Sequence, residues 1–348
     1  MRSIIYSLFK VFIRIGLFFY SKKIIVKGTE NIPKKGAVLF MANHPNGLID
    51  PILIATHIKR KTHFLVRAAV FKNRIVAYFF DLLGMMPIYR IRDGVKQLSK
   101  NQAIFDKCES ILKNNKTLLI FPEGSHNRKR TIRPLSKGFT RIIFQTLENN
   151  PQTVIHIVPI GITYQNASAY PAKIALSFGT SITTDSYFKN SNKTEVVNFL
   201  KNEVTKQLEN LTVHIDDDDN YENTLSLLNK QNVDFTDVVY TNKLIEQKSI
   251  KSSNSKVKNE RFKPLLYLLI VNSFIPYTIW KLLSKKVDEV EFIDTFRFSF
   301  NIILFPFFYT VQSFLMYLAF NWDTAVLYFT FSILLVLLYT KVSATPTE

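Results

Sequence analysis

The feature that most constrains the fold of this chain is a regular alternation of strand-like and helix-like runs between residues 24 and about 185. Short apolar runs are followed by longer runs with helical periodicity. This alternation predicts an α/β fold with a mainly parallel sheet flanked by helices, whose functional residues gather at strand ends. The expected strands are 37–41, 62–66, 86–90, 117–121, 153–159 and 172–178, and the expected helices are 51–58, 70–82, 95–114 and 137–148.

The composition favours a protein that works at a membrane. The 348 residues are 47% hydrophobic, yet they carry a formal net charge of +18. This combination fits a folded domain with apolar membrane segments, and the basic excess suggests anionic membrane lipids or a phosphorylated substrate as partner. No basic nucleic-acid motif is visible, so nucleic acid is not expected. The single cysteine, Cys108, excludes an internal disulfide, and no Cys/His cluster has metal-site spacing.

The chain is expected to start with an amphipathic helix over residues 1–23 at the membrane interface. Ser3, Ser7, Lys10 and Arg14 step by 4, 3 and 4, which places them on one stripe of a helix with large apolar residues around the rest. A secretory signal fits less well, because charge interrupts the apolar run and no small-residue cleavage site follows. A helix packed on the core remains the alternative.

The C-terminal part is expected to be a membrane region over residues 264–341, reached through a charged connector over 186–263 that includes one helix at 193–211. Residues 298–320 are long and apolar enough to span a bilayer. Residues 325–340 are short but uncharged, so the two runs predict a helical hairpin with Trp322 at the interface. Residues 264–283 either span or re-enter the bilayer, and the basic loop at 284–297 indicates a cytoplasmic face.

The loop leaving the first expected strand carries the clearest chemical motif, Asn-His-Pro-Asn-Gly-Leu-Ile-Asp at residues 43–50. An imidazole in such a loop is exposed at the sheet edge, and a carboxylate a few residues on can fold back and fix its tautomer. Together, His44 and Asp50 could take a proton from a hydroxyl near neutral pH. The alternative is structural, because an aspartate before Pro51 also has the pattern of a helix N-cap.

Two further strand ends carry cations. The string Gly-Met-Met-Pro-Ile-Tyr-Arg runs from Gly84 to Arg90, and an arginine at a strand end can clamp a phosphate with paired N–H donors. A plain surface arginine is the alternative there. The string Phe-Pro-Glu-Gly at 121–124 exposes Glu123 in a turn, and Arg128 opens a basic cluster after it that could receive a phosphate.

A fourth segment, Val-Pro-Ile at 158–160, ends another expected strand. In this order the four segments resemble the motifs of the glycerol-phosphate and lysophosphatidic-acid acyltransferase family, namely Asn-His…Asp, Gly-x-x-Phe-Ile-x-Arg, Phe-Pro-Glu-Gly and Val-Pro-Ile/Val. The resemblance covers residues 24–185, which would then be an acyltransferase domain. It marks Asn43, Gly84, Pro122 and Pro159 as supporting positions of the site.

The chain departs from the common motifs in three places. Five residues separate His44 from Asp50 where four are usual, Pro87 replaces phenylalanine, and Ser-His-Asn-Arg at 125–128 replaces Thr-Arg after Glu-Gly. These departures resemble the branch with fungal glycerol-3-phosphate and dihydroxyacetone-phosphate acyltransferases, and residues 272–309 resemble its membrane part more loosely. The usual third-motif arginine is thereby lost, and Arg128 is the candidate substitute.

The resemblance implies direct acyl transfer without a metal, a cofactor or a covalent enzyme intermediate. His44 would remove the proton from the acceptor hydroxyl, and Asp50 would orient the ring and stabilise its cation. Arg90 and Arg128 would grip the phosphate of the acceptor. Glu123, followed by Gly124, would bind an acceptor hydroxyl or hold the basic cluster.

The sequence leaves the substrates open. The acceptor is expected to be glycerol 3-phosphate or dihydroxyacetone phosphate, with a lysophospholipid such as 1-acylglycerol 3-phosphate or an acylated amino acid as alternatives. The donor is acyl-CoA, an acyl carrier protein or an acyl phosphate. A lipid hydrolase is disfavoured by the basic cluster, and a non-catalytic lipid-binding scaffold on the membrane surface is disfavoured by the intact His44, Asp50 and Glu123.

Overall fold

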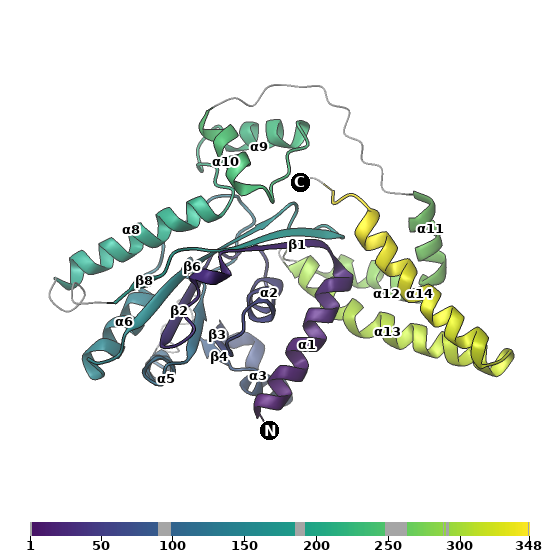
Figure 1. Ribbon diagram of the computed structural model, residues 1–348, viewed down its shortest axis with the longest axis horizontal. Coiled ribbons are helices and arrows are strands. Elements are labelled where there is room, and N and C mark those ends of the chain that lie inside the picture. The colour runs from purple at the N-terminus through teal and green to yellow at the C-terminus, as the bar shows by residue number, and fades with distance from the viewer. Residues whose placement is uncertain are drawn as a thin grey trace.

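The computed structural model of the chain describes residues 2–89, 99–184, 192–247, 263–287, 289, 292–346 and 348. Its centre is an eight-stranded sheet flanked by helices (Figure 1). The strands are β1 (Ser21–Lys27), β2 (Ala37–Ala42), β3 (Thr62–Arg67), β4 (Met85–Ile88), β5 (Thr117–Ile120), β6 (Ile155–Tyr164), β7 (Ala172–Phe178) and β8 (Ile182–Thr183).

The strand order is β1-β7-β6-β2-β5-β3-β4, and β8 pairs with β6. The run β6-β2-β5-β3-β4 is parallel throughout, as is the pair of β1 with β7, whereas β7 and β8 run antiparallel to β6. The predicted mainly parallel sheet is therefore confirmed. Because β2, β5, β3 and β4 point the same way, the loops that follow them meet along one edge of the sheet.

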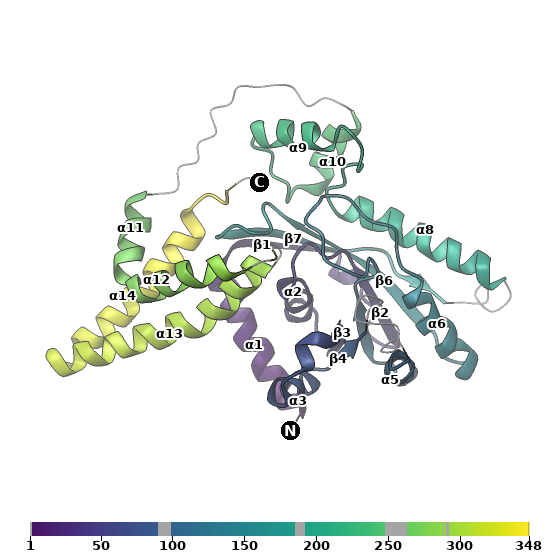
Figure 2. The ribbon, with the colours of Figure 1, turned by 180° about the vertical axis from the view of Figure 1, so that it is seen from behind.

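Helices cover both faces of the sheet (Figure 2). They are α1 (Arg2–Tyr20), α2 (Ile49–His57), α3 (Arg74–Leu82), α5 (Asn101–Lys113), α6 (Gly138–Asn149), α8 (Lys193–Leu211), α9 (Tyr221–Lys230), α10 (Val238–Glu246), α11 (Lys263–Asn272), α12 (Phe274–Leu283), α13 (Ile293–Ala319) and α14 (Trp322–Val342). Helices α1 and α2 pack on one face and α5, α6 and α8 on the other.

Strand β2 shows how the sequence sets this layering. Its side chains alternate between faces, as they must in a strand. Phe40 is fully buried in the core shared with α1 and α2, whereas Leu39 and Met41 are fully buried in the core shared with α5, α6 and α8. A strand that is apolar on both faces reads as a continuous hydrophobic run, which is why residues 37–41 were predicted correctly.

Several predicted boundaries were wrong. The first helix ends at Tyr20, and residues 21–23 belong to β1, because this segment pairs in parallel with β7. Strand β4 ends at Ile88, short of Arg90, and α2 starts two residues before Pro51. Helices α9 and α10 in the connector were not expected, because their apolar residues are sparse along a charged sequence. They nevertheless bury Leu228 and Val238 in a small core of their own with Phe235.

The C-terminal region contains two helices, α13 and α14, that are long and apolar enough to cross a membrane. They run side by side as a hairpin that projects away from the sheet (Figure 1). Trp322 stands exposed at the turn of this hairpin. Helices α11 and α12 are bent by 95° at the single residue Ser273, as in a broken span or a re-entrant segment.

Helix α1 packs on the domain with one side only. Leu17 and Ile13 are buried against the core. The large apolar side chains at positions 4, 8, 11, 12, 15 and 18 are exposed. An exposed apolar face of this size marks a contact surface. The placement of α1 in a membrane interface stays a prediction.

Gly161 provides a test of how α8 is seated on the sheet. A Cβ atom at this position of β6 would overlap the backbone carbonyl of Leu211 at the end of α8. We expect Gly161→Ala to destabilise the protein by about 1–3 kcal/mol, because backbone atoms would have to move apart. Gly138→Ala is the matched control, since a Cβ there has no neighbour closer than 3.8 Å. Thermal unfolding in detergent measures both, and equal melting temperatures would contradict the packing described.

Candidate active site

The centre of the site is the loop between β2 and α2. His44 Nδ1 lies 2.8 Å from Asp50 Oδ2, so the two residues that the sequence singled out do meet. The Asp50 side chain is fully buried, whereas 12% of the His44 side chain is exposed. Asp50 is not the N-cap, because α2 already starts at Ile49 and Leu48 holds the cap position. The structural interpretation of Asp50 as a cap is therefore wrong.

Asp50 is fixed by two further donors. Its Oδ2 also accepts a hydrogen bond from the backbone N–H of Asn46 at 2.7 Å, and its Oδ1 accepts one from the Tyr164 hydroxyl at 2.7 Å. Burial raises the pKa of Asp50 above its ordinary value, although these hydrogen bonds and His44 act in the opposite direction. A buried, more basic carboxylate attracts the Nδ1 proton of His44 more strongly, which leaves Nε2 as the ring atom able to accept a proton.

Aromatic rings set the plane of His44. Phe121 stacks on the imidazole, with ring centroids 3.8 Å apart and an angle of 13° between the planes. His126 meets it edge-on at a centroid distance of 5.9 Å. The backbone carbonyl of His44 accepts a hydrogen bond from Asn127 N at 2.9 Å. The third motif thus packs directly against the first and restricts the rotation of the imidazole.

Glu123 is held by an arginine of the basic cluster. Its Oε2 accepts a hydrogen bond from Arg133 Nε at 2.8 Å, and Arg133 also donates to the hydroxyl of Ser125 at 3.0 Å. Burial raises the pKa of Glu123 against the attraction of Arg133, and His44 is near enough to contribute. Of the two roles expected for Glu123, this geometry is that of holding the cluster. Gly124 turns the chain with φ +76° and borders open space.

The four supporting positions are structural. Asn43 clamps β6 by bonding both the N–H and the carbonyl of Ile162, at 2.7 and 2.9 Å. Gly84 adopts φ +78° in the turn before β4. The carbonyl of Pro122 accepts from Ser136 N at 2.8 Å. Pro159 lies within β6 opposite Met41 of β2.

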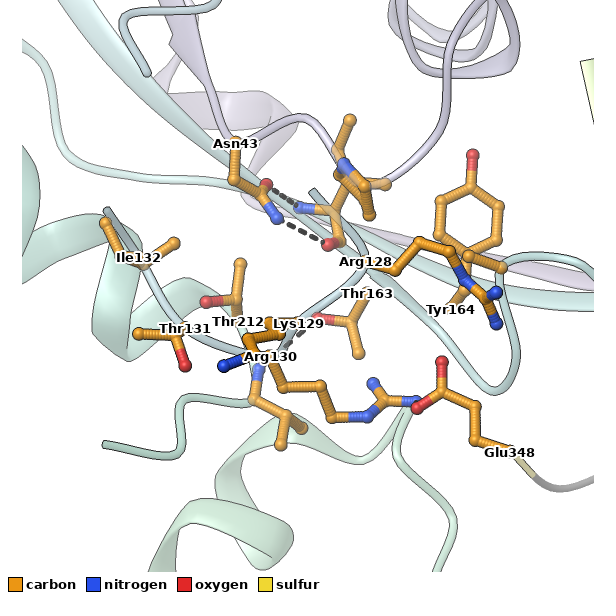
Figure 3. A pocket seen from close by; sticks show the side chains of 14 residues that line it. Asn43, Arg128, Lys129, Arg130, Thr131, Ile132, Thr163, Tyr164, Thr212 and Glu348 are labelled. Atoms are coloured by element: carbon orange, nitrogen blue, oxygen red, sulfur yellow. Dashed lines mark hydrogen bonds and ion pairs between the residues drawn. The ribbon is translucent and has the colours of Figure 1, made fainter. Parts of the chain in front are cut away.

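Arg128 lines a hollow together with Asn43, Arg130 and Tyr164 (Figure 3). Arg130 is committed to a fold role there, because it donates to the Gln165 carbonyl at 3.0 Å, pairs with Glu348 at 3.1 Å and stacks on Phe235. The Nε atom of Arg128 is buried and has no hydrogen-bond partner among the described residues.

Arg90 lies outside the described residues. Ile88, two positions earlier, pairs in register with Arg67 at the end of β3. Arg67 therefore stands at the same sheet edge as the second motif, and the sequence interpretation missed it. A basic residue directly after the predicted strand at 62–66 was the available signal.

An apolar cleft opens on the other side of α2. It lies between α1, α2 and the β3–β4 side of the sheet. Its lining is almost wholly apolar and comes from Tyr6, Phe9, Lys10, Ile13, Pro51, Ile52, Ala55, Thr56, Phe64, Leu83 and Met85. Pro51, which lines the cleft, directly follows Asp50 in the sequence.

Among the residues that the structure describes, no group of three or more His, Cys, Asp or Glu side chains is placed to hold a metal ion. Cys108 is buried in α5, where burial raises the pKa of its thiol to about 12. A thiol in that setting stays protonated and packs as an apolar side chain.

Comparisons with known proteins find similarity to acyltransferases. Residues 23–163 match a family model described as Acyltransferase. A 1-acyl-sn-glycerol-3-phosphate acyltransferase of Borreliella burgdorferi is 28% identical over 38% of this chain and 51% of its own length. Glycerol-3-phosphate O-acyltransferase 2 of Saccharomyces cerevisiae is 30% identical over 28% of this chain and 15% of its own length.

One further relative and one solved structure are also similar to this chain. A lyso-glycine lipid O-acyltransferase of Bacteroides thetaiotaomicron is 26% identical over 53% of this chain and 66% of its own length. The crystal structure of the 1-acyl-sn-glycerophosphate acyltransferase PlsC of Thermotoga maritima aligns at 20% identity and TM-score 0.45, over 60% of this chain and 80% of that one. The chain thus spans about half the length, or less, of the first two curated relatives.

The matched segment contains His44, Asp50 and Glu123, the residues that the fold brings to one sheet edge. Residues 23–163 are therefore a domain of the acyltransferase family.

Proposed function

We propose that this protein is a membrane-bound O-acyltransferase that moves a fatty acyl group from an acyl thioester to a hydroxyl of a glycerol-phosphate acceptor. The observation that carries the proposal is the couple between His44 Nδ1 and Asp50 Oδ2 at 2.8 Å, with the carboxylate buried and the imidazole reaching solvent. That arrangement leaves one ring nitrogen free to act as a general base.

The chemistry follows from the two nitrogen atoms of His44. Nε2 takes the proton of the acceptor hydroxyl while the hydroxyl oxygen attacks the thioester carbonyl. Asp50 stabilises the imidazolium that forms. The tetrahedral intermediate then collapses, the carbon–sulfur bond breaks and the thiolate leaves. The imidazolium returns its proton to the thiolate, so the enzyme ends in its starting state.

The arginine that ends β3 and the arginine that follows β4 in the sequence support a phosphorylated acceptor. Arg67 ends β3, and Arg90 follows Ile88 of the neighbouring strand by two residues. Paired guanidinium groups suit phosphate, since each offers N–H donors in a fixed fork. We assign the phosphate of the acceptor to these two arginines. Arg128, which lines a hollow with Asn43, is a third candidate. Arg133 is engaged with Glu123.

Three acceptor classes are candidates for the same acyl transfer. The five-residue spacer between His44 and Asp50 favours glycerol 3-phosphate or dihydroxyacetone phosphate, and the yeast relative is named for the former. The Borreliella relative favours 1-acylglycerol 3-phosphate, and the Bacteroides relative is named for a lyso-glycine lipid. Purified protein assayed against these acceptors with acyl-CoA or acyl carrier protein as donor separates the classes. Transfer to none of them, with wild-type protein folded, would overturn the proposal in favour of a lipid-binding scaffold.

The membrane is part of the proposed function. The acyl donor and product are amphiphiles, and α13 and α14 are apolar enough to cross a bilayer. The exposed apolar side chains of α1 and the six basic residues in the sequence at 248–263 suit contact with an anionic leaflet, as on the cytoplasmic face.

His44→Ala tests the catalytic base. We expect turnover to fall roughly 10²- to 10⁴-fold, because proton removal would be left to water. The matched control is His156→Ala near the start of β6, which pairs with Val38 at the opposite end of the sheet. That variant should keep wild-type turnover. Activity retained by His44→Ala in an acyl-transfer assay would exclude His44 as the base.

Ala55→Trp tests whether the apolar cleft takes the acyl chain. The indole would fill the cleft beside α2, so we expect turnover with long-chain donors to fall roughly 10-fold more than with medium-chain donors. Ala103→Trp, exposed on α5 across the sheet, is the matched control and should change neither. An equal loss with both donor lengths would show that the chain binds elsewhere.

A further inference from the structure

The first turn of α13 lies against the loop that carries the catalytic couple, although about 250 residues separate them in sequence. The hydroxyl of Thr295 accepts a hydrogen bond from the backbone N–H of Leu48 at 2.9 Å and donates one to Asn46 Oδ1 at 3.2 Å. Thr295 is buried. One side chain from the membrane region thus satisfies both a main-chain and a side-chain group of the loop.

Asp294 bonds the side-chain nitrogen of Asn46, whose side-chain oxygen is bonded by Thr295. Asn46 Nδ2 donates to Asp294 Oδ2 at 3.3 Å and to the Ala167 carbonyl at 3.0 Å. Asp294 is itself fixed, because it is fully buried and bonded to Tyr20 and Arg297. The side chain of Asn46 therefore has its oxygen and its nitrogen both engaged by α13.

A second contact runs through an aromatic ring just before α13. A Cβ atom on Gly47 would lie 2.7 Å from the ring of Phe292, so the ring covers the loop where only glycine leaves room. Phe292 also packs edge-on against His126 at a centroid distance of 4.9 Å. His126 in turn faces His44.

Asn46 connects these contacts to the chemistry, because its backbone N–H donates to Asp50 at 2.7 Å. We propose that Thr295 and Asp294 are positioning residues, which hold Asn46 and Leu48 so that Asp50 faces His44. The effect that this positioning has on turnover rests on the proposed function, whereas its effect on the order of the loop backbone does not. The acyltransferase domain at 23–163 would then depend for its active-site geometry on the membrane region.

The physical argument is that a loop holds a catalytic geometry only if surrounding groups fix its backbone. Small displacements of reacting groups are expensive, since about 1 Å of misplacement can lower a rate by roughly 100-fold. Removing the Thr295 hydroxyl would leave the Leu48 N–H and the side-chain oxygen (Oδ1) of Asn46 without this partner. The loop would lose its tie to α13 while His44 and Asp50 remained in the chain.

The test uses the full chain in detergent or lipid nanodiscs with Thr295→Val, Thr295→Ser and Thr310→Val. Valine keeps the shape of threonine without its hydroxyl, and serine keeps the hydroxyl. Thr310→Val is the matched control, because Thr310 lies on the same helix and its hydroxyl bonds the Pro306 carbonyl of that helix at 2.8 Å. The readouts are amide hydrogen exchange of residues 43–50, and kcat and KM for acyl transfer.

We expect Thr295→Val to raise amide exchange in residues 43–50 roughly 5- to 100-fold, since a hydrogen bond to a buried amide is lost. Its kcat should fall roughly 10- to 100-fold with KM changed by less than about twofold. Thr295→Ser and Thr310→Val should match the wild type in both readouts.

The exchange measurement decides the positioning role even if the proposed reaction is wrong. Unchanged exchange in Thr295→Val would overturn the inference whether or not its activity falls, as would failure of the serine variant to restore protection. Wild-type protein without transfer to any acceptor, but with exchange raised in Thr295→Val, would refute the proposed function and leave the loop contact established.

Discussion

The burial of Asp50 is the constraint on which the site depends. A carboxylate without solvent is tolerated only when its oxygens are hydrogen-bonded, and Asp50 receives His44, the Asn46 amide and the Tyr164 hydroxyl. These donors come from the catalytic loop and from β6, so the carboxylate ties the two together. The same bonds leave His44 a single orientation, which Phe121 reinforces by stacking on the ring.

The common direction of the parallel strands brings the other residues of the site to the same edge of the sheet. Because β2, β5, β3 and β4 run the same way, the histidine loop, the Glu123 turn and Arg67 emerge along one edge. These strands are packed between helices on both faces of the sheet, so the edge is rigid. The polar residues of the site lie in the loops that follow the strands. Helix α13 contacts the histidine loop through Thr295, whose hydroxyl accepts from the Leu48 N–H.

The motifs predicted that His44 and Asp50 meet, because both lie within one short loop, where sequence spacing limits distance. The role of Glu123 stays a prediction, although its carboxylate is bonded by Arg133 of the basic cluster. Arg128 was harder to place, because a residue in an irregular loop has no periodicity from which its direction follows. Helices α9 and α10 were missed, since their small core is formed mostly with each other and the loops around them.

The sequence by itself determined the α/β class, the motif order and the presence of apolar C-terminal helices, because each depends on local pattern along the chain. Tertiary structure alone decided that Tyr164 bonds Asp50 and that Thr295 and Asp294 hold Asn46. Those contacts join residues more than 100 positions apart, and no periodicity encodes such a distance. They exist because strand pairing and helix packing bring buried polar groups to the only partners within reach.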